Sequence, residues 1–169
     1  MTLIRCTQKL RKEMGLKSSD LYEAGDGSLL GDWYAHLFFQ DREKCIFFAA
    51  EKTLLCFLVT GLSRDSIRQL DEIFRDGLFR LLLDEGFQPK QATELFDECR
   101  TVNYGATADR SMTGTVNELV KDIQFLLPHH GGVGSPDLVT LNHDLNRVPM
   151  KRNKYVYAIE MTKAILADS

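Results

Sequence analysis

The segment from Gly31 to Val59, GDWYAHLFFQDREKCIFFAAEKTLLCFLV, constrains the fold of this chain more than any other. It places three runs rich in Phe, Leu, Ile and Val between short charged breaks, and such residues suit a pleated, buried surface. The runs predict an antiparallel meander, because the breaks are short enough for hairpin connections. The predicted strands cover Asp32–Gln40, Cys45–Ala50 and Thr53–Val59. The last two barely alternate with polar residues, so we expect both to be central strands that are covered on two faces.

The second connection leads to a prediction of register. If Glu51 and Lys52 form a two-residue turn, Cys56 lies opposite Phe47, and Cys45 is its diagonal neighbour on the same face. Two cysteines so close together raise a metal or redox hypothesis. However, no further cysteine lies near them in the sequence, and buried free cysteine commonly packs as a small hydrophobic side chain. We therefore interpret the stretch as core, and we predict no metal site and no cofactor.

The remainder of the chain shows mostly helical periodicity. Apolar spacing and capping residues predict helices over 7–15, 65–86, 90–98 and 109–127, a helix capped by Ser135 with Pro136 in its first turn, and strands over Thr2–Cys6 and Lys154–Glu160. Strands that follow one another, rather than alternating with helices, favour an α+β fold with a mostly antiparallel sheet over 32–59. A length of 169 residues is typical of one domain, so we expect a single domain over 1–169.

Charge and the length of apolar runs narrow the classes of function. The net charge is −3, and residues 18–146 carry 11 basic against 21 acidic side chains. This excess of acids argues against a general nucleic-acid binder. The apolar runs are far shorter than the roughly 20 residues of a membrane-spanning helix, and the start of the chain does not resemble a signal peptide. We expect a cytoplasmic protein with no membrane segment, whose four cysteines are reduced.

One polar cluster lies at the start of the 109–127 helix. Arg110 stands there beside hydroxyl side chains, and the N–H groups of a helix start bind anions readily. A plain N-cap by Asp109 is the alternative interpretation. Asn117 belongs to the polar row of the same helix, and we include it with Arg110 among the candidate ligand-binding residues.

A second polar cluster is LNHDLNRVPM, residues 141–150. Asn142 and Asn146 lie one helical turn apart and are followed by Arg147. Asn is a poor choice for an exposed helix face, so its amides either hold the backbone of a neighbouring segment or bind a ligand. Trp33, at the entrance of the first predicted strand, is either the edge of the core or a platform for the same ligand.

The quoted segments together resemble a family of small bacterial proteins known only as a domain of unknown function. The resemblance rests on four elements: a strand at Arg5–Thr7, GDWYA at Gly31–Ala35, the helix with Arg110, Gly114 and Asn117, and the LNxxLNRxPM element at Leu141–Met150. It covers most of the chain. It implies a bacterial cytosolic protein and assigns no activity.

Two functional hypotheses follow. The first is a non-enzymatic binding or regulatory module, whose polar groove holds a protein or a small anionic ligand through Trp33, Arg110, Asn117, Asn142, Asn146 and Arg147. The second is an enzyme or nucleic-acid-acting protein that holds phosphate through Arg110, Arg147 and the basic ends of the chain. In that case His36 or His143 is the expected base, and it has to lie close to the bound substrate.

Overall fold

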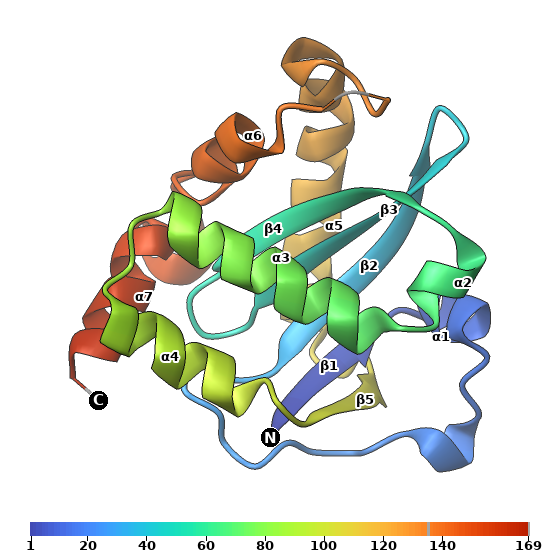
Figure 1. Cartoon of the computed structure of the whole chain (residues 1–169), viewed down its shortest axis with the longest axis horizontal. Coiled ribbons are helices and arrows are strands. Elements are labelled where there is room, and N and C mark those ends of the chain that lie inside the picture. The colour runs from blue at the N-terminus through green and yellow to red at the C-terminus, as the bar shows by residue number, and fades with distance from the viewer. Residues whose placement is uncertain (135, 169) are drawn as a thin grey trace.

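The computed structural model describes residues 1–134 and 136–168, and it is built on a five-stranded mixed sheet (Figure 1). The strand order is β4 (Cys56–Leu62), β3 (Glu43–Ala50), β2 (Trp33–Gln40), β1 (Thr2–Cys6) and β5 (Val102–Ala106). The predicted antiparallel meander is confirmed in β2, β3 and β4. β1 adds two parallel pairings, to β2 and to β5. The α+β fold class is confirmed.

Helices cover both faces of this sheet. They are α1 (Gln8–Met14), α2 (Arg64–Ile67), α3 (Leu70–Asp84), α4 (Pro89–Glu98), α5 (Arg110–Leu126), α6 (Leu138–Leu145) and α7 (Ala158–Ala167), with short 3₁₀ turns η1 (Ser18–Asp20), η2 (Leu127–His130) and η3 (Lys151–Asn153). In Figure 1, α3 crosses the front of the sheet and α5 lies behind it.

Alternation along the strands divides the core into two layers. On the α3 side, Trp33, Phe48, Phe57 and Phe74 form an aromatic cluster with ring centroids 4.9–6.0 Å apart. On the α5 side, residues of the opposite parity, such as Phe47, pack against α5 and α6. β3 is buried on both faces along most of its length, as its apolar sequence predicts.

The connection between β3 and β4 differs from the predicted two-residue turn. It contains four residues, because Ala50 donates to the Leu55 carbonyl, and Leu54 has a positive φ of 62°. Cys56 therefore lies opposite Ala49 rather than Phe47. Cys45 and Cys56 still lie on the α5 side of the sheet. The observed register differs from the predicted one by two residues, and a shift of two keeps each side chain on the same face.

β4 is an edge strand, and the expectation that it is central was wrong. Its first residues are buried nonetheless, because α6 packs against this first part of the edge. In sequence, an apolar strand covered by a helix looks the same as one covered by another strand.

Three predicted elements need correction. The long helix over 65–86 is broken, because Gln69 leaves the helical conformation (φ −104°, ψ 48°) between α2 and α3. α6 is capped by Asp137, which accepts from the Thr140 N–H, so Pro136 precedes the cap instead of following it. Ser135, the predicted cap, lies outside the described residues. The strand expected over 154–160 is a turn with Lys154 and Tyr155 at positive φ, followed by α7.

Candidate functional site

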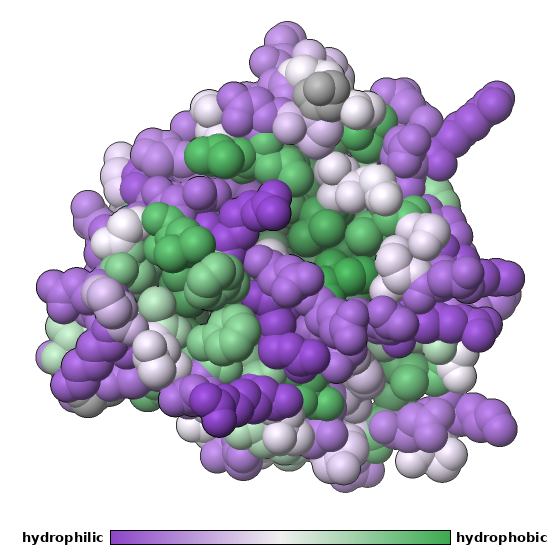
Figure 2. Space-filling view, in the orientation of Figure 1, coloured by the Kyte–Doolittle hydropathy of each residue, from purple (hydrophilic) through white to green (hydrophobic). Residues whose placement is uncertain are grey.

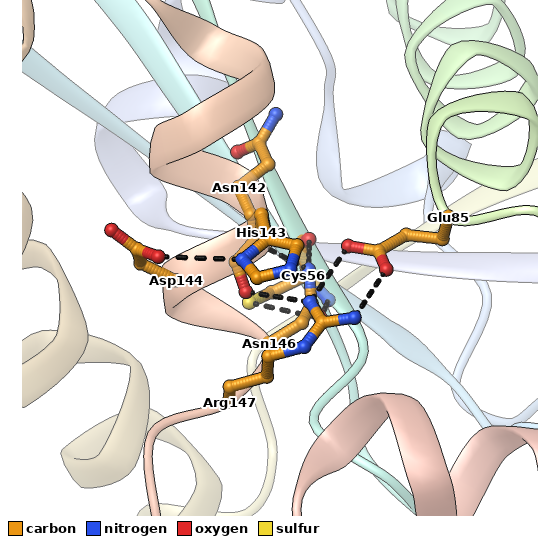
Figure 3. Close-up of polar contacts among 7 residues, drawn as sticks. All are labelled: Cys56, Glu85, Asn142, His143, Asp144, Asn146 and Arg147. Carbon is orange, nitrogen blue, oxygen red and sulfur yellow. Dashed lines mark hydrogen bonds and ion pairs between the residues drawn. The ribbon is translucent and has the colours of Figure 1, made fainter.

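The amide of Asn146 completes the edge of β4 in place of a neighbouring strand. It is fully buried, and its Oδ1 accepts from the Cys56 N–H at 2.9 Å while its Nδ2 donates to the Cys56 carbonyl at 2.8 Å (Figure 3). Nδ2 also donates to the Asn142 carbonyl, one turn earlier in α6. A single side chain thus satisfies both outward-facing backbone groups of one strand residue, as a paired strand would.

Asn142 repeats the contact one step further along the strand. Its Oδ1 accepts from the Leu58 N–H at 3.0 Å, while its side chain also borders a groove between α3, β4 and α6. Of the two interpretations left open by the sequence, both amides therefore take the role of holding the backbone of a neighbouring segment.

Arg147 joins the end of α6 to the end of α3. Its two terminal nitrogens lie 3.0 and 2.7 Å from the two carboxylate oxygens of Glu85, whose side chain is 5% exposed. The hydrogen bonds that Arg147 donates to Glu85 raise the pKa of Arg147 above its ordinary value. With the bond that Nη1 donates to the His143 carbonyl, three of the five N–H donors of the guanidinium are used, and Arg147 does not line the groove.

The other three predicted site residues lie apart from this cluster. Trp33 is only 3% exposed, in the aromatic layer on the α3 side, whereas Asn142 and Asn146 belong to α6 at the edge of the sheet. Arg110 and Asn117 are exposed on α5. The first N–H groups of α5 are occupied, since Asp109 accepts from Ser111 and Met112. The plain N-cap is thus the interpretation that the structure bears out at this helix start.

The two histidines considered as bases do not share a partner. His143 is on the exposed face of α6 beside Asp144, whereas His36 is on β2 opposite Phe47, on the α5 side of the sheet. Burial, and then the charge of Lys9, lowers the pKa of His36, and its Nδ1 is buried without a hydrogen-bond partner. His36 therefore resists protonation in the folded state.

This resistance predicts a pH-dependent stability. Because the folded-state pKa is below the unfolded value of about 6.5, the unfolded chain binds the proton more readily, and stability falls as the pH drops below about 6.5. Urea unfolding at pH 7.5 and 5.0 measures the loss for the wild type and for His36→Gln, in which this group cannot titrate. We expect a smaller loss in the variant, and an equal loss in both would contradict the assignment.

A groove of about 450 Å³ opens where β4 meets α3 and the start of α6. Its floor is apolar, from Phe57, Leu58 and Val59, and its walls carry Leu81 and Leu138. Figure 2 shows this hollow beside α3 as hydrophobic surface bordered by hydrophilic atoms. The volume lies within the range of ligand-binding clefts.

The polar rim of the groove is acidic. Three carboxylates, Asp76, Asp84 and Asp137, face one guanidinium, that of Arg80. Hydrogen bonds from Thr140 lower the pKa of Asp137, which keeps it ionised at neutral pH. The groove therefore attracts cations, and the anionic ligand expected from Arg110 and Arg147 is not favoured here.

Most of the residues that line the groove were not predicted from the sequence, because their pattern is that of an ordinary solvated helix face. Asp76, Arg80 and Asp84 follow each other at intervals of four residues on α3. The one available signal was Gly77, a glycine inside an otherwise strong helix. A Cβ at Gly77 would lie 2.4 Å from Cε2 of Phe57, so the glycine lets the helix approach β4 closely and leaves the floor of the groove open.

Neither an exposed cysteine nor a cluster of metal ligands is found among the described residues. All four cysteines are buried, and burial raises the pKa of Cys6 to about 12 and of Cys45 and Cys99 to about 11. Burial also raises the pKa of the Cys56 thiol. Within residues 1–134 and 136–168, no group of three or more His, Cys, Asp or Glu side chains is placed to hold a metal ion. No helix in these ranges is long and apolar enough to cross a bilayer.

Comparison with known families gives one match. Residues 3–161 match the family described as a domain of unknown function, DUF6933. The chain belongs to this family. The match confirms the kind of family that the sequence motifs indicated. No curated protein and no solved structure matches the chain.

Proposed function

We propose that the domain is a non-enzymatic protein-interaction module, and that the groove between α3, β4 and α6 holds a positively charged, partly apolar segment of its partner. The groove itself is the observation that supports this proposal, because it combines an apolar floor with an acidic rim. Its charged groups favour lysine and arginine side chains, and its floor buries the apolar side chains between them.

The shape of the groove favours a segment of protein over a compact small molecule. Its α3 wall extends from Ile73 to Asp84, eleven residues further along the helix. At 1.5 Å per residue this wall is about 16 Å long, which equals about five residues of extended chain. A basic peptide segment in extended conformation has this length and carries positive charges and apolar side chains in alternation.

Fluorescence anisotropy with two labelled heptapeptides tests the proposal. The probes are Lys-Val-Lys-Val-Lys-Val-Lys and the charge-reversed Glu-Val-Glu-Val-Glu-Val-Glu. We expect the lysine peptide to bind, to weaken as salt is added because exposed charges are screened, and to bind far better than the glutamate peptide. Absence of saturable binding by the lysine peptide at low salt overturns the proposal.

Charge reversal in the protein locates the site. The double variant Asp76→Lys/Asp84→Lys changes the rim, whereas Glu118→Lys/Asp122→Lys makes the same change of net charge on the exposed face of α5. We expect the first to reduce affinity at least tenfold and the second to leave most of it. Equal losses in both would show attraction to net charge alone and would contradict a site in the groove.

A further inference from the structure

The groove runs along an edge of the sheet whose outward backbone groups are only partly satisfied. Ala50 donates to the Leu55 carbonyl, so alternation places Phe57 and Val59 in hydrogen-bonded pairs with β3, and the backbone groups of Leu58 between them point away from the sheet. The Cys56 and Leu58 N–H groups confirm this direction, because both are bonded by amides of α6.

Beyond Asn142 the edge is open. Alternation directs the Leu58 carbonyl and the Thr60 N–H to the same side as the Leu58 N–H. Among the described residues, no hydrogen bond from a side chain or from backbone outside the sheet reaches either group. Leu58 and Val59 line the floor of the groove, and Thr60 follows Val59 directly in β4.

The open edge is short and has a defined end. Lys44 pairs with Leu62 instead of Gly61, so β4 contains an extra residue there, and Gly61 has a φ of 67°. Such a bulge bends an edge strand and ends regular pairing. The α6 amides close one end of the edge and the bulge closes the other, which leaves room for one short strand.

Resting on the proposed function of the groove, we propose that the partner's segment binds as a sixth β-strand beside β4. One residue of that segment donates its N–H to the Leu58 carbonyl and accepts from the Thr60 N–H. Its neighbours along the segment place their side chains alternately toward α3 and toward α6. These main-chain bonds fix the register, and the groove selects the side chains.

The acidic rim decides what the added strand carries. Asp76 and Asp84 lie on the α3 wall, so basic side chains are favoured on the face of the added strand that is directed toward α3, and Asp137 adds a negative charge at the start of α6. The apolar contacts on the α6 side come from Leu138 and the 55% exposed Val139. A second copy of this chain does not suit the site, because it would bring the same acidic rim against this one.

A methylation scan of the lysine–valine peptide tests strand addition separately from groove binding. Each peptide of the set carries one N-methyl group, which removes one backbone donor and leaves the side chains in place. In an edge-paired strand the N–H groups face β4 and solvent alternately. We expect affinity to fall at least tenfold for methylation at one set of alternate positions, because there the methyl group either removes the bond to the Leu58 carbonyl or is directed against β4, and to change less than threefold at the positions between them, where it faces solvent.

The outcomes separate the two proposals. If the parent peptide binds and all methylated peptides bind equally well, or lose affinity without alternation, strand addition is wrong while the groove remains the binding site. If the parent peptide does not bind, both proposals fail.

The protein side of the bond is tested by Thr60→Pro, which removes the N–H of Thr60. Proline is tolerated on edge strands where the N–H faces outward, and urea unfolding checks that the variant is folded. We expect it to lose at least tenfold in affinity for the parent peptide, compared with Thr60→Val, which keeps the N–H. Equal affinities of a folded Thr60→Pro and Thr60→Val overturn the assignment, and the methylation scan decides the matter if the proline variant does not fold.

Discussion

Replacing Asn146 with alanine is expected to destabilise the protein by roughly 3 kcal/mol or more. The change removes the partners of the Cys56 N–H and carbonyl, and it leaves both backbone groups buried beneath α6. Each buried polar group left without a partner costs about 1–3 kcal/mol, and the cavity left by the side chain adds to this. Urea unfolding measures the effect, and amide hydrogen exchange at Cys56 locates it.

Two further alanine variants calibrate this result. Asn117→Ala removes an exposed amide from α5, and we expect it to change stability by less than about 0.5 kcal/mol. Asn142→Ala leaves only the Leu58 N–H without its partner, so an intermediate loss of about 1 kcal/mol is expected. If Asn146→Ala is as stable as Asn117→Ala, the amide does not replace a neighbouring strand.

Capping residues and short charged breaks in the sequence predicted the elements that are stabilised by contacts between residues close together in the chain. Thr7 caps α1 by accepting from the Leu10 N–H, and Gly15 ends it at a φ of 72°, as the sequence indicated. The β2–β3 hairpin was predictable from two apolar runs with a charged break between them. Its turn residues Asp41 and Arg42 both have positive φ, which is the conformation that matches the twist of two paired strands.

Elements that depend on distant segments were not predictable in the same way. The β3–β4 connection is held by the side chain of Asn153, which donates to the Thr53 carbonyl at 2.6 Å from 100 residues further along the chain. The turn that contains Asn153, with Lys154 and Tyr155 at positive φ, replaces the strand that was predicted over 154–160. Tyr155 and Tyr157 alternate as strand residues do, yet both are exposed. The alternation of residue types alone therefore does not distinguish a strand from an exposed turn of this kind.

The candidate site was predictable only in part, for the same reason. Two asparagines one turn apart are unusual on a helix, and this anomaly pointed to α6, where both amides bond the backbone of β4. The position of β4 at the edge of the sheet, which gives these amides their role, is set by the pairing of the whole sheet. Asp76 and Asp84 line the groove only because α3 lies close against β4, and Gly77 determines how close.

Adding one methyl group at Gly77 is expected to destabilise the protein by about 1–3 kcal/mol, although alanine favours helices. The new Cβ would lie 2.4 Å from Cε2 and 2.9 Å from Cδ2 of Phe57, whereas carbon atoms in contact are about 3.5–4.0 Å apart. Phe57 is 1% exposed and packs against Phe48, Phe74 and Trp33, so these three rings hold it in place next to α3. The cost of overpacking therefore exceeds the gain of up to about 1 kcal/mol in helix propensity.

Gly114 provides the matched control, because it also lies inside a helix and, apart from the backbone of that helix and its chain neighbours, nothing is within 4 Å of its Cβ position. Gly114→Ala is expected to raise stability by about 0.5–1 kcal/mol, so the two variants should shift the urea midpoint in opposite directions. Phe57→Leu should reduce the penalty of Gly77→Ala in a double-mutant cycle, since both changes affect the same contact. Stabilisation by both alanines, with no coupling to Phe57, would mean that α3 lies further from β4 than the structure places it. The groove would then be wider than the space that one added strand fills.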